Sequence, residues 1–122
     1  DELKELIQNA EVKNGVSILG AVVHVDNINE LREAADFVKA KLPVSAVILG
    51  TAAGDKVNLV GMASPDAVKA GIHMGKVISQ AAKICGGGGG GKPANAQAGG
   101  KDVSKLADAV AQGVKIISGM LD

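Results

Sequence analysis

The residues best suited to chemistry gather around one glycine-rich segment. A run of glycines is followed by a cation, a proline, two amides and a second pair of glycines: Gly86, Gly87, Gly88, Gly89, Gly90, Gly91, Lys92, Pro93, Asn95, Gln97, Gly99 and Gly100. Because glycine lacks a Cβ, its backbone N–H groups can converge on an anion, to which a nearby lysine adds a full charge. We expect the start of the following helix to add the positive end of its dipole. This composition favours a phosphate-binding loop, while a flexible linker and a tight helix–helix turn remain alternatives.

A second set of polar residues precedes the glycines at helical spacing. It consists of Lys69, His73, Lys76, Gln80 and Lys83, which are alternately four and three residues apart. A continuous helix would place them in one stripe. Between residues 67 and 101 there is no Asp or Glu. We therefore expect the stripe to join Lys92, Lys101 and Lys105 in a basic surface around the glycines, with an ordinary solvated helix face as the alternative.

Catalytic patterns are missing from the sequence. His24 is expected within or at the edge of a strand, and His73 has no evident carboxylate partner for acid–base work. The single cysteine, Cys85, excludes an internal disulfide and a Cys-cluster zinc site, and we interpret it as a small helix-end residue. The spacing of a P-loop is met up to Lys92, but Pro93 replaces the hydroxyl residue that would bind magnesium. We predict neither a catalytic residue nor a metal site.

Composition narrows the class of protein further. The 122 residues suit one domain, and Phe37 is the single aromatic residue, which excludes RNA-binding modules that stack bases on aromatic side chains. The net charge is zero, but residues 1–64 carry six basic and nine acidic groups, and residues 65–122 carry seven and four. No apolar run approaches the ~18 residues of a membrane span, and the first residues are unlike a signal peptide. The lone cysteine favours a reducing compartment.

Hydrophobic periodicity and turn signals predict a mixed α/β order of elements. We expect helices over 1–10, from Asn27 or Asn29 to Pro43, from Pro65 to about Ile84 with a break near His73, and from Lys101 or Asp102 onward; strands over 16–25, 44–49 and 57–63; and a loop over 85–100. The first two strands enclose a helix and should be parallel, whereas the second and third should form a hairpin. The fold class is therefore α/β: a small mixed sheet of three or more strands covered by helices, with a glycine-rich loop between the last two helices.

The glycine segment also carries a family resemblance. Residues 86–100, followed by Lys101-Asp102 and a Lys-Leu-x-x-Ala helix, resemble the signature loop of DHH-associated domains, most nearly the version in the C-terminal domain of alanyl-tRNA synthetases. Asn14-Gly15-Val16 and His73-Met74-Gly75-Lys76 support the resemblance, which covers most of residues 14–110. Two positions depart from it, since the family often has arginine in place of Lys92 and an acid in place of Ala94. The histidine of related phosphoesterases is missing from the glycine motif.

The resemblance implies an organisation and a function. Residues 1–12 would end a preceding helical segment, residues 13–122 would form the DHH-associated domain, and the chain, which lacks an initiating Met, would belong to a longer protein. Its role would be to bind the outer corner of alanine-specific tRNA without catalysis and to link aminoacylation with editing. We expect the contacts to come from the glycine segment together with His73, Lys76, Lys83 and Lys101.

The same resemblance implies partners for the longer protein. Its partners would be tRNA and the rest of a cytoplasmic alanine–tRNA ligase chain, and a homodimer is an alternative that stays open. The longer enzyme would use ATP, magnesium and an editing-domain zinc, whereas this part would need no cofactor. A dimerisation or structural module and a small-nucleotide-binding accessory domain remain alternatives.

Overall fold

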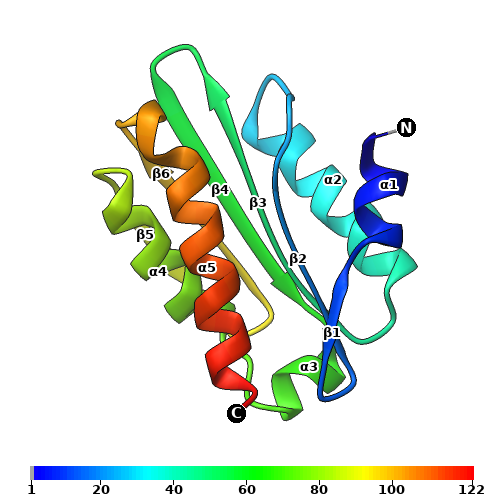
Figure 1. The fold of residues 1–122 in the computed structure, drawn as a ribbon. Coiled ribbons are helices and arrows are strands. Elements are labelled where there is room, and N and C mark those ends of the chain that lie inside the picture. Colours follow the sequence, from blue (N-terminus) through cyan, green and yellow to red (C-terminus); the bar gives the residue numbers. More distant parts are fainter. Residues whose placement is uncertain (1) are drawn as a thin grey trace.

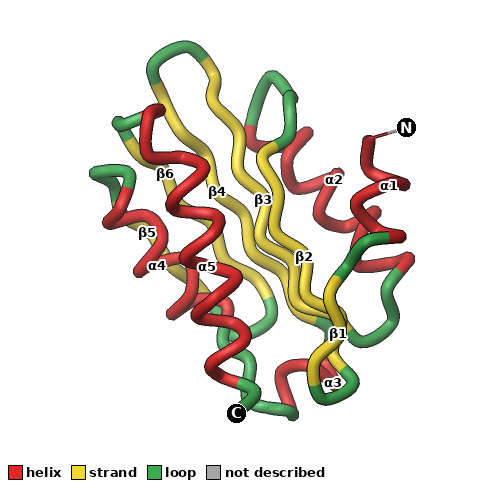
Figure 2. Tube along the Cα trace, in the orientation of Figure 1, coloured by secondary structure: helices red, strands yellow, loops and turns green. Residues whose placement is uncertain are grey.

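The computed structural model describes residues 2–122 as one six-stranded sheet with helices on both faces (Figure 1, Figure 2). The strand order is β1-β2-β3-β4-β6-β5. In chain order the elements are α1 (Glu2–Gln8), β1 (Glu11–Lys13), β2 (Val16–Val22), α2 (Ile28–Lys41), β3 (Ser45–Ala53), β4 (Lys56–Ala63), α3 (Pro65–Lys69), α4 (Met74–Ile84), β5 (Gly88–Gly91), β6 (Asn95–Gly100), the 3₁₀ turn η1 (Val103–Lys105) and α5 (Leu106–Met120).

The centre of the sheet follows the predicted topology. β2 and β3 are parallel and α2 connects them, while β3 and β4 form the expected antiparallel hairpin. The Asn27 side chain accepts a hydrogen bond from the Glu30 N–H and caps α2, as predicted. Every residue of β3 from Ser45 to Thr51 is buried, which explains the unbroken apolar run in the sequence. The mixed α/β class is confirmed.

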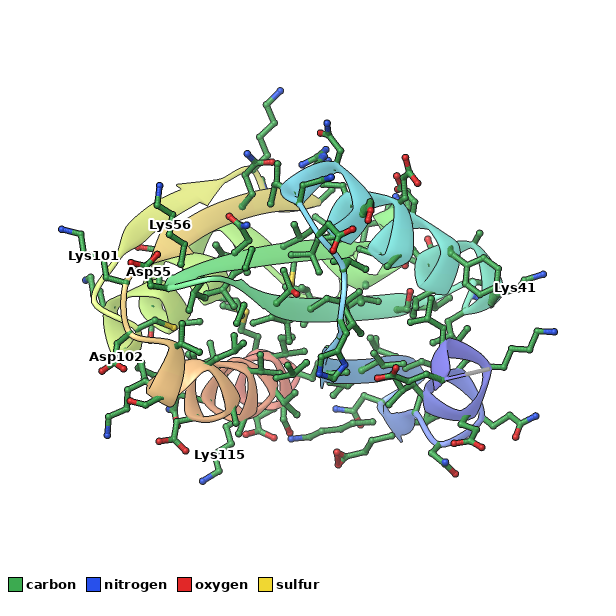
Figure 3. The ribbon with its side chains drawn as sticks, turned by 90° about the horizontal axis from the view of Figure 1, so that it is seen from above. Lys41, Asp55, Lys56, Lys101, Asp102 and Lys115 are labelled. Atoms are coloured by element: carbon green, nitrogen blue, oxygen red, sulfur yellow. The ribbon has the colours of Figure 1, made fainter. Side chains whose placement is uncertain are left out.

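Each face of the sheet has its own hydrophobic core. Ile48 packs in one cluster with α4 and α5, whereas its neighbour Leu49 packs in the other with α2 and α1. This alternation is the ordinary pleat of a strand buried on both sides. Seen from above, α2 lies over one face and α5 over the other (Figure 3).

The predicted loop over residues 85–100 was wrong, because most of it is a β-hairpin. β5 and β6 pair antiparallel, with Gly88 opposite Gly99 and Gly91 opposite Ala96, and β6 also pairs with β4. Ala96 and Ala98 are buried between exposed Asn95 and Gln97, which is a strand pattern built from small residues. The prediction missed this alternation because the glycine-rich composition is typical of a loop. We call residues 86–100 the glycine hairpin.

Smaller departures lie at the ends of the predicted elements. The break near His73 is confirmed, since α3 ends at Lys69 and α4 begins at Met74. The last helix begins with η1 after Asp102, whose side chain accepts the Ser104 N–H. At the N-terminus, Asp1 lies outside the described residues, and α1 packs against α2. The short strand β1 was not predicted and spans the expected boundary between residues 12 and 13, which stays a prediction. Within residues 2–122, no helix combines the length and apolarity needed to cross a membrane.

Candidate phosphate-binding site

The turn of the glycine hairpin is hydrogen-bonded to the first turn of α4. The N–H of Met74 donates to the Pro93 carbonyl at 2.9 Å, and the N–H of Gly75 donates to the Lys92 carbonyl at 3.1 Å. Gly75 is buried there, and any Cβ on it would collide with the Gly91 carbonyl group. A glycine is therefore required for helix and hairpin to approach this closely. The hairpin turn satisfies two of the orphan N–H groups of the helix.

An open groove of about 460 Å³ lies between α4 and β5. We call it the α4–β5 groove, and its lining residues are His73, Gly75, Lys76, Ser79, Gln80, Lys83, Gly89, Gly90 and Gly91. The structure thus brings together two separate features of the sequence, the basic helix face and the middle of the glycine run. His73 shapes the start of the groove, because its Nδ1 accepts the Lys76 N–H at 3.2 Å and caps α4.

The free edge of β5 offers backbone donors to this groove. Lys92 and Asn95 exchange two backbone hydrogen bonds at the hairpin turn. In an antiparallel ladder every second residue bonds the partner strand, so Gly90 and Gly88 continue this pairing with β6. The N–H groups of Gly89 and Gly91 consequently point away from β6, at an outer edge of the sheet. These two N–H groups could donate to an anion at the strand edge, where the carbonyl groups of the same two glycines also point outward.

Positive charge around the groove is not neutralised. Lys76 and Lys83 are exposed, and within residues 2–122 the one ion pair joins Lys13 in β1 to Asp122, neither of which lines the groove. Residues 67–101, which build the groove, contain no acid. A phosphate in the groove would therefore meet lysines that it does not share with a carboxylate.

Two parts of the predicted basic surface are wrong. Lys69 belongs to α3, so the stripe of five residues is broken, and its remaining part starts at His73, the N-cap of α4. At the N-terminus of the following helix, the Asp102 carboxylate accepts both the N–H and the hydroxyl of Ser104. An acid already occupies the place where the helix dipole would attract a phosphate.

The ends of the glycine hairpin lie apart from the groove. They form a second hollow of about 350 Å³ that is lined by Lys56, Gly86, Gly87, Gly88, Gly99, Gly100 and Lys101. Lys56 and Lys101 reach this end of the molecule from β4 and from the loop after β6, and Asp55 and Asp102 lie at the same end (Figure 3). Their carboxylates make this hollow less favourable for an anion than the α4–β5 groove.

The side chains of Asn95 and Gln97 lie on the opposite face of the sheet from the groove. Their amide oxygens accept hydrogen bonds from Nη1 of Arg32, at 3.3 Å for Asn95 and 2.7 Å for Gln97. Arg32 was not among the predicted residues, since it belongs to α2, more than sixty positions earlier in the chain. The sequence places Arg32 on a helix but contains no signal that pairs it with β6.

Neither Cys85 nor His24 lines the α4–β5 groove. Cys85 is fully buried at the end of α4, and burial, followed by the charge of Asp102, raises the pKa of its thiol above the ordinary 9.0. His24 is exposed and lies beyond the end of β2, contrary to the strand position expected for it. No group of three or more potential metal ligands occurs within the described part of the chain.

Comparison with known proteins decides the family. The family model described as the DHHA1 domain matches residues 15–118. The chain belongs to the DHHA1 domain family. The alanine–tRNA ligase of Acetivibrio thermocellus is 46% identical over 119 residues, which are 98% of this chain and 14% of that protein. That of Bacillus subtilis is 42% identical over 110 residues, 90% of this chain and 12% of that protein. The chain thus spans about an eighth of the length of these relatives.

A solved structure agrees with this assignment. This DHHA1 domain resembles the crystal structure of the C-Ala domain from Aquifex aeolicus alanyl-tRNA synthetase, with a TM-score of 0.77, 30% identity, and coverage of 91% of this chain and 99% of that one. The resemblance to the C-terminal domain of alanyl-tRNA synthetase is therefore confirmed. RecJ from Thermus thermophilus shares the fold alone, at 13% identity and a TM-score of 0.62. The match places this DHHA1 domain with an appended part of a synthetase.

Proposed function

We propose that this chain is a non-catalytic tRNA-binding module of an alanine–tRNA ligase and that the α4–β5 groove binds phosphates at the outer corner of the tRNA. One observation carries the proposal: Lys76 and Lys83 flank the outward N–H groups of Gly89 and Gly91 with no acid on the elements that build the groove. The similarity to parts of alanine–tRNA ligases supports the choice of tRNA.

The chemistry of the groove suits a phosphodiester. Its unesterified oxygens would accept the two strand-edge N–H groups, while lysine ammonium groups supply charge and release counterions from the RNA. Such contacts position a backbone and do not read bases. Selectivity would come from the shape of the tRNA, which agrees with a chain that has one aromatic residue, Phe37.

Within the longer enzyme, the module would hold one tRNA for both aminoacylation and editing. We assign the ATP, magnesium and zinc chemistry of a cytoplasmic ligase to other parts of that enzyme. Lys92, at the exposed hairpin turn, would add a point charge to the phosphate contacts.

Binding to labelled tRNA, measured by fluorescence anisotropy over a salt series, tests the proposal. We expect an alanine tRNA transcript to bind and an acceptor-stem minihelix, which lacks the outer corner, to bind much less. Lys76→Ala and Lys83→Ala should each weaken binding about three- to tenfold and lower the slope of log K against log salt by about 1. Lys115→Ala is the matched control, because Lys115 projects from α5 away from the groove (Figure 3). Equal losses in all three variants, or no salt dependence, would contradict the proposal.

A protein-contact role is the second candidate, and one surface favours it. Val12 in the edge strand β1 is 65% exposed, which is unusual for a large apolar residue next to unpaired strand backbone. Analytical ultracentrifugation would test this role. A mass that rises with concentration and falls back in Val12→Lys, in a chain that does not bind tRNA, would favour a dimerisation module.

A further inference from the structure

Arg32 lies on the sheet face opposite the α4–β5 groove, and its guanidinium has no acidic partner within residues 2–122. Its Nη1 donates to the side-chain oxygens of Gln97 and Asn95, which are neutral acceptors. Neutral partners orient a guanidinium without cancelling its charge. Arg32 makes no ion pair within residues 2–122, although Glu33 and Asp36 are exposed on the same helix.

The two amides use one end of the guanidinium and leave the other available. Within residues 2–122, neither Nε nor Nη2 of Arg32 takes part in a hydrogen bond. These two nitrogens lie side by side and form the planar fork that matches two oxygens of one phosphate. Because Arg32 is half-buried and fixed at Nη1, less side-chain entropy is lost when the fork is filled.

The two strands beside the fork, β5 and β6, carry no acidic residue. β6 presents Gln97 and Gly99 on this face, and the adjacent β5 is made of glycine only. α2 packs over β3 and β4, so the outer two strands are uncovered here. The acids of α2 disfavour an approach over the helix, whereas residues 67–101 contain no acid. An anion would therefore reach Arg32 across β6.

We propose that Arg32, oriented by Asn95 and Gln97, is a second phosphate-binding site for the same tRNA, on the opposite side of the glycine hairpin from the α4–β5 groove. This inference rests on the proposed function. β5 lacks side chains, so the edge between the two sites is only one backbone thick, and two backbone segments of one folded RNA can contact it from both sides. The ligand at Arg32 is a phosphodiester that the fork binds through two hydrogen bonds.

Binding of the alanine tRNA transcript to single variants separates this site from the groove. Arg32→Ala should weaken binding about tenfold and lower the salt slope by about 1. Arg32→Lys keeps the charge but loses the fork, so most of the affinity should still be lost while the salt slope stays near the wild-type value. Gln97→Leu removes an orienting acceptor without removing charge and should give a smaller loss with an unchanged slope. Lys115→Ala is the control for a remote cation.

The outcomes distinguish failure of this site from failure of the proposed function. If the wild-type chain does not bind tRNA, the proposed function is wrong and this inference falls with it. If the wild type binds and Lys76→Ala weakens it while Arg32→Ala does not, only the second site is wrong. Wild-type affinity in Arg32→Lys would refute the fork. The double variant Arg32→Ala/Lys76→Ala should show losses that multiply, as independent contacts do. Circular dichroism of each variant must match the wild type, and an Arg32→Ala variant that loses its fold would leave Arg32→Lys and Gln97→Leu to decide.

Discussion

Replacing Gly75 by alanine tests the packing that creates the α4–β5 groove. Gly75 is the second residue of α4, and helix propensity alone predicts that alanine stabilises a helix by up to about 1 kcal/mol at such a position. The structure predicts the opposite sign. A Cβ on Gly75 would lie 2.8 Å from the carbonyl carbon of Gly91 and nearer still to its oxygen, and it would lie 2.9 Å from Cε1 of His73. The Gly91 atoms are backbone, which cannot rotate away.

The cost follows from what must move. To relieve the overlap, the start of α4 has to withdraw from the hairpin turn, which lengthens the hydrogen bonds from Met74 to Pro93 and from Gly75 to Lys92. Each is worth about 1 kcal/mol, and packing between helix and hairpin is lost as well. After the propensity gain is subtracted, we expect Gly75→Ala to lower the free energy of unfolding by about 1–2 kcal/mol.

Urea unfolding followed by far-UV circular dichroism measures this change, since the chain has no Trp or Tyr to report by fluorescence. Gly119→Ala is the matched control: Gly119 is also helical, in α5, and a Cβ there meets nothing within 4 Å. We expect that variant to be as stable as the wild type or more stable. If Gly75→Ala is stabilising to the same degree, the close approach of α4 to the hairpin is wrong.

Three further outcomes follow from the same geometry. A Cβ at Gly89 would lie 2.5 Å from the Gln97 carbonyl oxygen, whereas a Cβ at Gly88 meets nothing within 4 Å. Urea unfolding should therefore show Gly89→Ala destabilised by about 1–3 kcal/mol and Gly88→Ala unchanged. Equal stabilities of the two variants would refute the register of β5 against β6. His73→Ala should lower the free energy of unfolding by about 1 kcal/mol, because the cap of α4 is lost. His73→Asn should restore most of that stability, because asparagine is a good capping residue. If the two variants are equally unstable, the cap does not contribute as described. Because the pKa of the Cys85 thiol is raised, its contribution to stability is present below pH 9.0 and is lost as the pH rises above that value, since the thiol ionises first in the unfolded chain. The urea midpoint should therefore fall more between pH 8 and 10 in the wild type than in Cys85→Ala, and parallel pH profiles would contradict the assignment.

The central fold could be predicted because its signals are local. β-branched runs, the Asn27 cap and the stop at Pro43 mark β2, α2 and β3 along the chain, and their pairing follows from the rule for crossover connections. The glycine hairpin could not be predicted in the same way. Glycine has low strand propensity, and β5 forms because β6 and α4 accept a backbone without side chains, which is a tertiary condition.

The candidate site could likewise be predicted from the sequence only in part. The gathering of His73, Lys76 and Lys83 beside the glycines was predictable, because they are close in sequence and share a helix face. The outward amides depend on the register of β5 against β6, and the Arg32 site depends on how α2 crosses the sheet. Neither relation leaves a periodic trace in the sequence.

The backbone amides of β5 give the most direct test of where tRNA binds. In ¹H–¹⁵N correlation spectra of the labelled chain, titration with alanine tRNA should shift or broaden the N–H signals of Gly89 and Gly91 before those of α5. The neighbouring amides of Lys76 and Lys83 should respond with them. Saturated binding that leaves Gly89 and Gly91 unchanged, with all shifts confined to α1 and α2, would contradict a phosphate site at this edge.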